Sequence, residues 1–215
     1  YMRGDFMNLT ELSCKDFSFE LSSKKPVPGG GGAAALAGSL GVALNMMVAN
    51  FSKGKKKFIQ YEKQHEDILK RGEKLRIDLL NLVEKDAEYF EPLSKAYSMP
   101  ATTAEEKAKK ENQMQKCLKD ACRAPLETME LVYEGIKLHE EILDISSLTI
   151  ISDIGVGVQM LKAALNSAYL SVLINLKYIN DDQYVNNLKK RTEVLLTDGN
   201  KKADEIFEKV LITLR

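Results

Sequence analysis

Apolar residues recur at helical spacing along most of the chain, and no segment alternates strictly between polar and apolar residues as a half-buried strand does. Between about 56 and 93 the apolar positions form one stripe, made of Ile68, Leu75, Leu79, Leu82, Val83, Tyr89, Phe90 and Leu93. Further helices are predicted over 126–139 and 182–214, and 144–180 is apolar nearly throughout. The pattern predicts an all-α fold, a bundle of long and partly kinked helices.

Capping residues predict where two helices begin. Ser13 is a suitable N-cap for a short helix in which Phe17 and Leu21 share one face. Thr103 is the second N-cap, and two glutamates follow it in the first turn, where negative charge suits the helix dipole.

Proline and glycine predict the breaks between helices. Pro92 is expected to end the long helix that begins near residue 56, and Pro125 to kink or break the next one. Gly199 is expected to interrupt the last helix. We interpret residues 1–12 as a tail whose leading positions need not belong to the natural chain, and 13–215 as one domain without internal repeats.

The composition is that of an ordinary globular protein and narrows the range of partners. Hydrophobic residues make up 44% and charged residues 29% of the 215, with 31 basic and 31 acidic side chains. This balance gives no general attraction to nucleic acid or to an anionic membrane. Three unevenly spaced cysteines (Cys14, Cys117 and Cys122) give no disulfide framework and indicate a reducing, cytoplasmic location. His65 and His139 lie 74 positions apart, so no metal site is expected.

One uncharged segment is long enough to raise the question of a membrane span. It runs for 23 residues from Gly29 to Phe51 and is followed by the lysine tract, which is Lys53 with Lys55 to Lys57. Its leading glycines and its polar Ser39 and Asn45 favour a buried helix of a soluble protein over 33–52, so no membrane partner is expected. The lysine tract is either a solvated helix end or a site for a polyanionic tail.

Four glycines, Gly29, Gly30, Gly31 and Gly32, precede this helix. No Gly-Lys-Ser/Thr follows them and no strand comes before them, which excludes a nucleotide P-loop and a Rossmann fingerprint. Flexible backbone that leads into a helix N-terminus can still present N–H groups to an anion or to a carbonyl group.

Asp86 is a carboxylate in the middle of an apolar stripe. Its neighbours one helical turn away are Leu82, Val83, Tyr89 and Phe90. A carboxylate in this position must be paired, protonated or facing a cavity, because burying a lone charge is costly. Two hypotheses follow: a structural hydrogen bond to another helix, or a catalytic acid or base with a raised pKa.

Asp153 begins a second unusual stripe, in which the residues on one helix face are small or polar. These residues are Asp153, Gly157, Met160, Ala164, Ser167, Ser171 and Asn175. Such a face suits either close packing between helices or a groove that holds a ligand.

Three blocks, in the right order, resemble the cyclodeaminase/cyclohydrolase family, which includes the C-terminal domain of formiminotransferase-cyclodeaminase. The blocks are 28–38 with 47–50 and 54–56, then 82–90, then 152–156 with 168–169 and 172–176. The resemblance covers about residues 13–210. The sequence departs from it at Gly32, where many members have Ser, at Glu84, where some have Asp, and at Ser171, where Asn is common.

The resemblance implies an all-helical homodimer that acts on tetrahydrofolate derivatives without a metal or a permanently bound cofactor. The first hypothesis is conversion of 5-formimidoyltetrahydrofolate to 5,10-methenyltetrahydrofolate with loss of ammonia. The alternative is a cyclohydrolase that uses water to interconvert the methenyl and 10-formyl compounds. A hypothesis of another class, a non-catalytic helical scaffold or binding protein, fits the charged outer faces equally well.

The resemblance also implies which residues form the site. Asp86 is the expected catalytic aspartate, and Asp153 is expected to pair with it or to orient the pterin. The expected substrate-binding residues are Gly29, Gly30, Gly31, Gly32, Asn50, Lys55, Lys56, Ser152 and Asn175. The glycines would let a flat ring lie close to the backbone, and the lysines would receive the glutamate tail of a folate, polyglutamylated or not.

Overall fold

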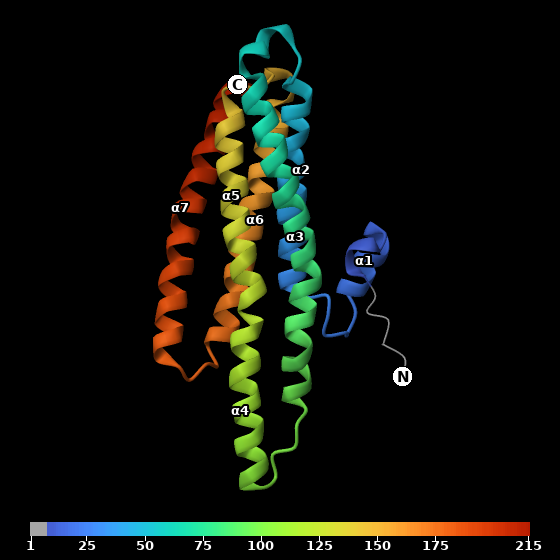
Figure 1. Cartoon of the computed structure of the whole chain (residues 1–215), viewed down its shortest axis with the longest axis vertical. Helices are drawn as coiled ribbons and strands as arrows, with labels where there is room; N and C mark the ends of the chain where they lie inside the picture. Colours follow the sequence, from blue (N-terminus) through green and yellow to red (C-terminus); the bar gives the residue numbers. More distant parts are fainter. Residues whose placement is uncertain (1–7) are drawn as a thin grey trace.

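Six long helices, α2 to α7, run roughly along the long axis of the molecule in a computed structural model that describes residues 8–215 (Figure 1). The elements in chain order, with η for a 3₁₀ helix, are η1 (Leu9–Glu11), α1 (Cys14–Leu21), α2 (Gly30–Ser52), η2 (Lys56–Tyr61), α3 (Glu62–Tyr97), α4 (Ala104–Ala121), α5 (Arg123–Leu143), η3 (Leu148–Ile150), α6 (Ile151–Leu176) and α7 (Asp182–Leu214). Residues 8–215 contain no strand, which confirms the all-α prediction.

Both predicted N-caps are confirmed. The Ser13 hydroxyl accepts a hydrogen bond from the backbone N–H of Asp16 at 3.1 Å, and α1 begins at the next residue after Ser13. Thr103 forms a capping box with Glu106, in which each side chain accepts a hydrogen bond from the other residue's backbone N–H. Part of the predicted tail (1–7) lies outside the described residues, and Leu9 of η1 is buried against the bundle.

Four predicted boundaries are wrong. Helix α3 begins at Glu62 instead of near residue 56, because the preceding six residues form the 3₁₀ helix η2. Pro92 lies inside α3, on its exposed side, where water can take the carbonyl group that the proline leaves unbonded, and the helix continues to Tyr97. Gly199 lies inside an unbroken α7, and its missing side chain makes room for Leu165, whose Cδ2 would be 2.5 Å from an added Cβ. The second helix begins at Gly30 instead of residue 33, so three of the four glycines form its first turn.

Helix α2 packs against α3, α5 and α6 and lies behind α3 in Figure 1. Its small residues let these neighbours come close. A Cβ added to Gly157 of α6 would lie 3.1 Å from the carbonyl oxygen of Gly41 and 2.4 Å from Nε2 of His139 on α5. A Cβ added to Gly135 of α5 would lie 3.0 Å from Cγ2 of Val42. The helix backbones therefore almost touch at this level of the bundle.

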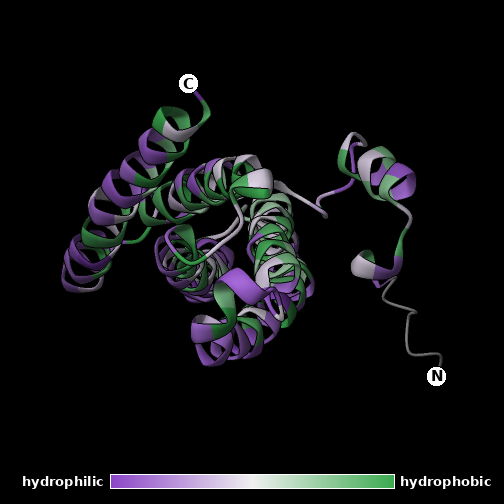
Figure 2. Ribbon diagram, turned by 90° about the horizontal axis from the view of Figure 1, so that it is seen from above, coloured by the Kyte–Doolittle hydropathy of each residue, from purple (hydrophilic) through white to green (hydrophobic). Residues whose placement is uncertain are grey.

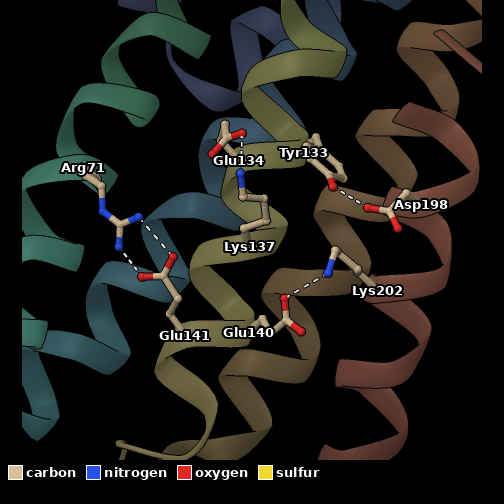
Figure 3. A network of polar contacts seen from close by, with 8 residues as sticks. All are labelled: Arg71, Tyr133, Glu134, Lys137, Glu140, Glu141, Asp198 and Lys202. Atoms are coloured by element: carbon tan, nitrogen blue, oxygen red, sulfur yellow. Dashed lines mark hydrogen bonds and ion pairs between the residues drawn. The ribbon is translucent and has the colours of Figure 1, made fainter. Parts of the chain in front are cut away.

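The outer helices alternate between hydrophobic and hydrophilic residues, as expected of helices with one face in the core (Figure 2). On the surface, α5 forms ion pairs with α3 and with α7 (Figure 3). Arg71 of α3 makes a two-pronged ion pair with Glu141, and Lys202 of α7 donates to Glu140 at 3.3 Å. Exposed pairs of this kind contribute at most ~1 kcal/mol each, so they align the helices more than they stabilise them.

Two segments, Gly30–Ser52 and Leu148–Leu176, are long and apolar enough to cross a membrane by length and composition alone. Within the bundle they pack against each other as α2 and α6, and only 56% and 44% of their most apolar windows are buried. Their place in the bundle core explains the buried part of this apolar character.

Replacing Gly41 by Val is expected to destabilise the fold. A Cβ at this position would lie 2.7 Å from Cγ of Leu161 and 2.9 Å from the carbonyl oxygen of Gly157, and a backbone oxygen inside the bundle cannot move away easily. Overpacking of this kind costs about 1–3 kcal/mol, which thermal unfolding followed by circular dichroism would measure as a lower Tm. Gly30→Ala is the control, since nothing lies within 4 Å of its Cβ. Equal Tm values for the two variants would contradict the close approach of α2 and α6.

Candidate active site

Asp86 of α3 points at the first turn of α2. Its Oδ2 accepts a hydrogen bond of 2.9 Å from the backbone N–H of Gly32. A Cβ at Gly31 would lie 2.2 Å from Oδ1 of Asp86, so any side chain at position 31 would displace the carboxyl group. The free N–H groups of this helix N-terminus attract negative charge to the same place.

Burial raises the pKa of Asp86 from 3.8 to about 6, and the hydrogen bond from Gly32 acts in the opposite direction. Desolvation prevails because the carboxyl group is surrounded by apolar side chains of α3 and by the glycine turn. A carboxyl group with a pKa near 6 can both give and take a proton close to neutral pH, which is the property needed for general acid–base catalysis.

A cavity of about 190 Å³ lies beside this carboxyl group. Its walls come from segments far apart in the sequence: the turn before α2, Asp86 and Phe90 of α3, the junction of α4 and α5, and the last turn of α6. Pro125 and Ala121 form the junction wall, and Asn175 and Ile174 form the wall from α6. The cavity thus combines an acid with an apolar lining and a few polar groups, as small-molecule sites do.

Asn175 is held in a fixed orientation at the edge of the cavity. Its Nδ2 donates to the carbonyl oxygens of Ala121, at 3.2 Å, and of Ser171, at 3.0 Å. Because the amide nitrogen is used in this way, the Oδ1 oxygen is the atom that can accept an N–H from a ligand.

The cavity brings together one half of the residues predicted for the site. Gly29, Gly30, Gly31, Asp86 and Asn175 line it, and the backbone of the fourth glycine of the run donates to the carboxylate. The side chain of Asp86 is hydrogen-bonded to another helix, as the first hypothesis states, and it also faces a cavity and has the raised pKa that the second hypothesis requires.

The other half lies at the opposite end of α2 and α6, and we call it the far cluster. The far cluster consists of Asn50, Lys55, Lys56, Ser152 and Asp153. Asp153 and Asn175 are 22 residues apart on α6, which corresponds to ~33 Å along the helix axis. Asp153 therefore does not pair with Asp86 within one chain, contrary to the first of the two roles expected for it.

Several cavity residues carried little or no signal in the sequence. Phe90 is one helical turn after Asp86, so its place on the same face could have marked it. Pro125 was recognised as a helix break but not as a wall of the site. Ile174 is one apolar residue in an apolar helix, and only the folded chain reveals that it borders a cavity.

The two histidines are buried in the core. His139 donates from Nδ1 to the carbonyl oxygen of Gly135 at 2.9 Å, and burial lowers its pKa to about 4, so the ring is neutral. Among residues 8–215, no three His, Cys, Asp or Glu side chains are grouped closely enough to hold a metal ion.

Comparison with known proteins places this arrangement in a family. Residues 13–194 match the family described as formiminotransferase-cyclodeaminase. A methenyltetrahydrofolate cyclohydrolase of Methylorubrum extorquens is 38% identical over 190 residues, which is 88% of this chain and 91% of that protein. A formimidoyltransferase-cyclodeaminase of Rattus norvegicus is 28% identical over 93% of this chain, which spans 37% of that relative.

A solved structure agrees over nearly the whole chain. The crystal structure of a formiminotetrahydrofolate cyclodeaminase from Thermotoga maritima matches with a TM-score of 0.81 and 27% sequence identity. The match covers 94% of this chain and 98% of that one.

Asp86→Asn is expected to stabilise the protein above pH 6. The folded chain holds the Asp86 proton up to about pH 6, whereas the unfolded chain releases it near pH 3.8, so wild-type stability falls as the pH rises through this range and then levels off. The full difference corresponds to at most ~3 kcal/mol. Urea unfolding at pH 3.5 and 7.5 would therefore give a higher free energy of unfolding for the variant than for the wild type only at pH 7.5. Glu88→Gln, on the exposed side of α3, is the matched control, and a gain independent of pH would contradict the raised pKa.

Proposed function

This chain belongs to the formiminotransferase-cyclodeaminase family, and we propose that it is a folate one-carbon enzyme in which Asp86 transfers the protons. The observation that carries the role of Asp86 is its largely but not fully buried carboxyl group, with a pKa raised to about 6, on the wall of a cavity built by four parts of the chain. A helical scaffold would gain nothing from a carboxylate that costs stability in this place.

Two reactions of this class are candidates, and the relatives support both. The stand-alone relative from Methylorubrum extorquens, at 38% identity, favours the cyclohydrolase as the main reaction. The Thermotoga maritima structure, which also matches over nearly its whole length, favours the cyclodeaminase. We propose the cyclohydrolase first, because the higher identity is to the protein with that name, and the cyclodeaminase as the second candidate.

The cyclohydrolase reaction requires one proton to leave and one to arrive. Water attacks the carbon that bridges N5 and N10 in the methenyl compound, and Asp86 in its ionised form takes the proton from the attacking water. The bond between this carbon and N5 then breaks, and Asp86 returns the proton to N5, which leaves the formyl group on N10. The second proton of the water goes to solvent when the carbonyl group forms.

The cyclodeaminase reaction also requires Asp86 to take up one proton and to give it back. N10 attacks the carbon of the protonated formimidoyl group on N5 and loses its own proton to Asp86, so that the tetrahedral intermediate carries a neutral amino group, which it then expels. That leaving nitrogen needs a proton to depart as ammonia, and the protonated Asp86 supplies it. A carboxyl group with a pKa near 6 suits both steps, whereas one with an ordinary pKa near 4 would be a weak base and would rarely hold the proton.

The remaining expectations from the family resemblance stand as parts of this proposal. The substrate is a tetrahydrofolate derivative, polyglutamylated or not. Lys55 and Lys56, which the resemblance implies as the site of its acidic tail, lie at the opposite end of α2 from the Asp86 cavity, so they do not line that cavity within one chain. The enzyme acts without a metal or a permanently bound cofactor, as a homodimer, in the cytoplasm.

An absorbance assay on the purified protein separates the candidates. With 5,10-methenyltetrahydrofolate, a loss of the methenyl absorbance faster than in buffer is the result expected of a cyclohydrolase. With 5-formimidoyltetrahydrofolate, the appearance of that absorbance together with ammonia is the result expected of a cyclodeaminase. A folded sample that is silent on both substrates would support the non-catalytic scaffold and overturn the proposal.

Asp86→Asn is expected to lower kcat on the active substrate by roughly 10²–10⁴-fold, because an amide cannot exchange the proton. Folate binding, followed by the quenching of tyrosine fluorescence, should persist, since an amide oxygen can still accept from the N–H of Gly32. The Glu88→Gln control should keep the wild-type kcat. Full turnover by Asp86→Asn would exclude Asp86 as the proton-transfer group.

A further inference from the structure

We propose that Tyr178 and Lys177, in the turn between α6 and α7, form a subsite that holds the p-aminobenzoylglutamate part of a folate beside the Asp86 cavity. The proposal rests on the proposed function, because it assigns a part of the same substrate. Three observations carry it: the cavity is too small for a whole folate, Tyr178 extends the cavity wall by one helical turn, and hydrogen bonds fix this turn to α4.

The cavity holds only the reacting part of a folate. With about 190 Å³ it is smaller than the about 300–1,000 Å³ that sites for drug-sized ligands usually offer. N10, which takes part in both candidate reactions, is bonded directly to the p-aminobenzoyl ring, so this ring lies next to the cavity when the reacting carbon is at Asp86. The pterin and the p-aminobenzoylglutamate therefore need surfaces that adjoin the cavity.

A shallow groove on α2 and α6 suits the pterin. The groove has a volume of about 530 Å³ and shares Gly30, Ser171 and Ile174 with the cavity. All the residues that line it are uncharged and most are glycine or alanine, so a flat ring can lie close to the backbone. Because no lining residue is cationic, the groove offers no charged partner to the carboxylates of the glutamate.

Tyr178 continues the stripe of α6 that forms a wall of the cavity. Ser171, Ile174 and Asn175 line the cavity, and Tyr178 follows Ile174 by four residues, which is ~6 Å along the helix axis. The backbone of Lys177 is helical, and the N–H of Tyr178 donates to the carbonyl oxygen of Asn175 at 3.1 Å. The helical register therefore extends to Tyr178, whose side chain is 51% exposed on the same face.

The turn that carries Tyr178 is fixed to α4, which lies beside it (Figure 1). Gln115 of α4 donates from Nε2 to the carbonyl oxygen of Tyr178 at 2.8 Å, and its Oε1 accepts from the N–H of Asn180 at 2.8 Å. Glu111 supports both amides, since its Oε1 accepts from Gln115 at 3.0 Å and from the side chain of Asn180 at 2.9 Å. Ile179, between the two bonded residues, is buried. A binding residue held in this way is placed before the ligand arrives.

The chemistry of the two side chains matches the p-aminobenzoylglutamate. The ring of Tyr178 can stack on the aromatic ring of the ligand, and Lys177 can pair with a carboxylate of the glutamate. Nζ of Lys177 lies 5.6 Å from the centroid of the Tyr178 ring, so the cation is next to the aromatic surface. Lys177 also follows the cavity residue Asn175 by two positions, whereas Lys55 and Lys56 belong to the far cluster.

Binding of p-aminobenzoylglutamate alone, followed by ligand-observed NMR, tests the subsite without reference to activity. Tyr178→Leu and Lys177→Ala are each expected to weaken binding by roughly 3–10-fold, because one loses the stacking partner and the other the cation. With p-aminobenzamide, which has no carboxylate, Lys177→Ala should bind as the wild type does and Tyr178→Leu should still bind more weakly.

Matched substitutions elsewhere on the surface are the controls for this experiment. Tyr97→Leu, at a side chain that is 49% exposed, and Lys190→Ala, at an exposed position of α7, should leave the binding of both compounds unchanged. Equal binding by the wild type and both subsite variants would overturn the proposal, as would a wild type that binds no p-aminobenzoylglutamate at millimolar concentration.

Tyr178→Leu is also expected to raise the KM of the active substrate by roughly 3–10-fold with little change in kcat, because the ring binds substrate and transition state alike. Tyr178→Phe, which keeps the ring, should restore the lower KM. Gln115→Ala should raise KM by releasing Tyr178, so adding it to Tyr178→Leu should raise KM no further. Gln183→Ala, an exposed glutamine of α7, is its control. A lower kcat at unchanged KM would overturn the subsite, and a further rise in the double variant would exclude Gln115 as a positioning residue.

The outcomes separate this proposal from the proposed function. If the wild type is inactive on both folates, the function fails, while the binding of p-aminobenzoylglutamate still decides whether the subsite exists. If the wild type is active but the variants of Tyr178 and Lys177 keep its KM and its binding, the subsite is wrong and the function stands.

Discussion

The contact between the Asp86 carboxyl group and the first turn of α2 determines what several other parts of the sequence must be. Position 31 must be glycine, because a Cβ there would lie 2.2 Å from the carboxyl oxygen. Helix α3 must carry an acid on its apolar side, and the surrounding side chains must exclude enough water to keep the pKa near 6. The resulting loss of stability is the kind of local cost that functional sites bear and that the rest of the core offsets.

The same helix that receives Asp86 also holds the bundle together. Small residues on α2 let α5 and α6 approach until Gly41 and Gly157 almost touch, so the helix is enclosed on three sides by its neighbours. Its fourth side is apolar and exposed. One helix therefore meets the requirements of core packing, of the cavity and of a surface suited to association, which explains why it has no charged residue and is rich in glycine and alanine.

Structural features could be predicted from the sequence where a side chain interacts with residues that are close to it in the chain. Ser13 and Thr103 bond to the backbone within one turn, so their capping role could be predicted. Asp86 could be found because a carboxylate in an apolar stripe conflicts with its surroundings. The predictions failed where the outcome depended on distant parts of the chain: Pro92 is tolerated because it faces water, and Gly199 belongs to a helix because Leu165 packs against it. A stripe of residues also does not reveal at which end of the bundle it lies.

The glycines of α2 have a consequence for the order of events during synthesis. Each glycine costs a helix about 1 kcal/mol relative to alanine, and α2 contains five, so this segment has a low helix propensity of its own and depends on its neighbours for its stability. Its contact at Gly157 is made 116 residues later than Gly41, which at roughly 5–20 residues per second is a delay of roughly 6–23 s. During that time a long uncharged segment is outside the ribosome with α3 beside it but without α5 and α6 to cover its other sides. We expect the nascent chain to rely on chaperones in this interval.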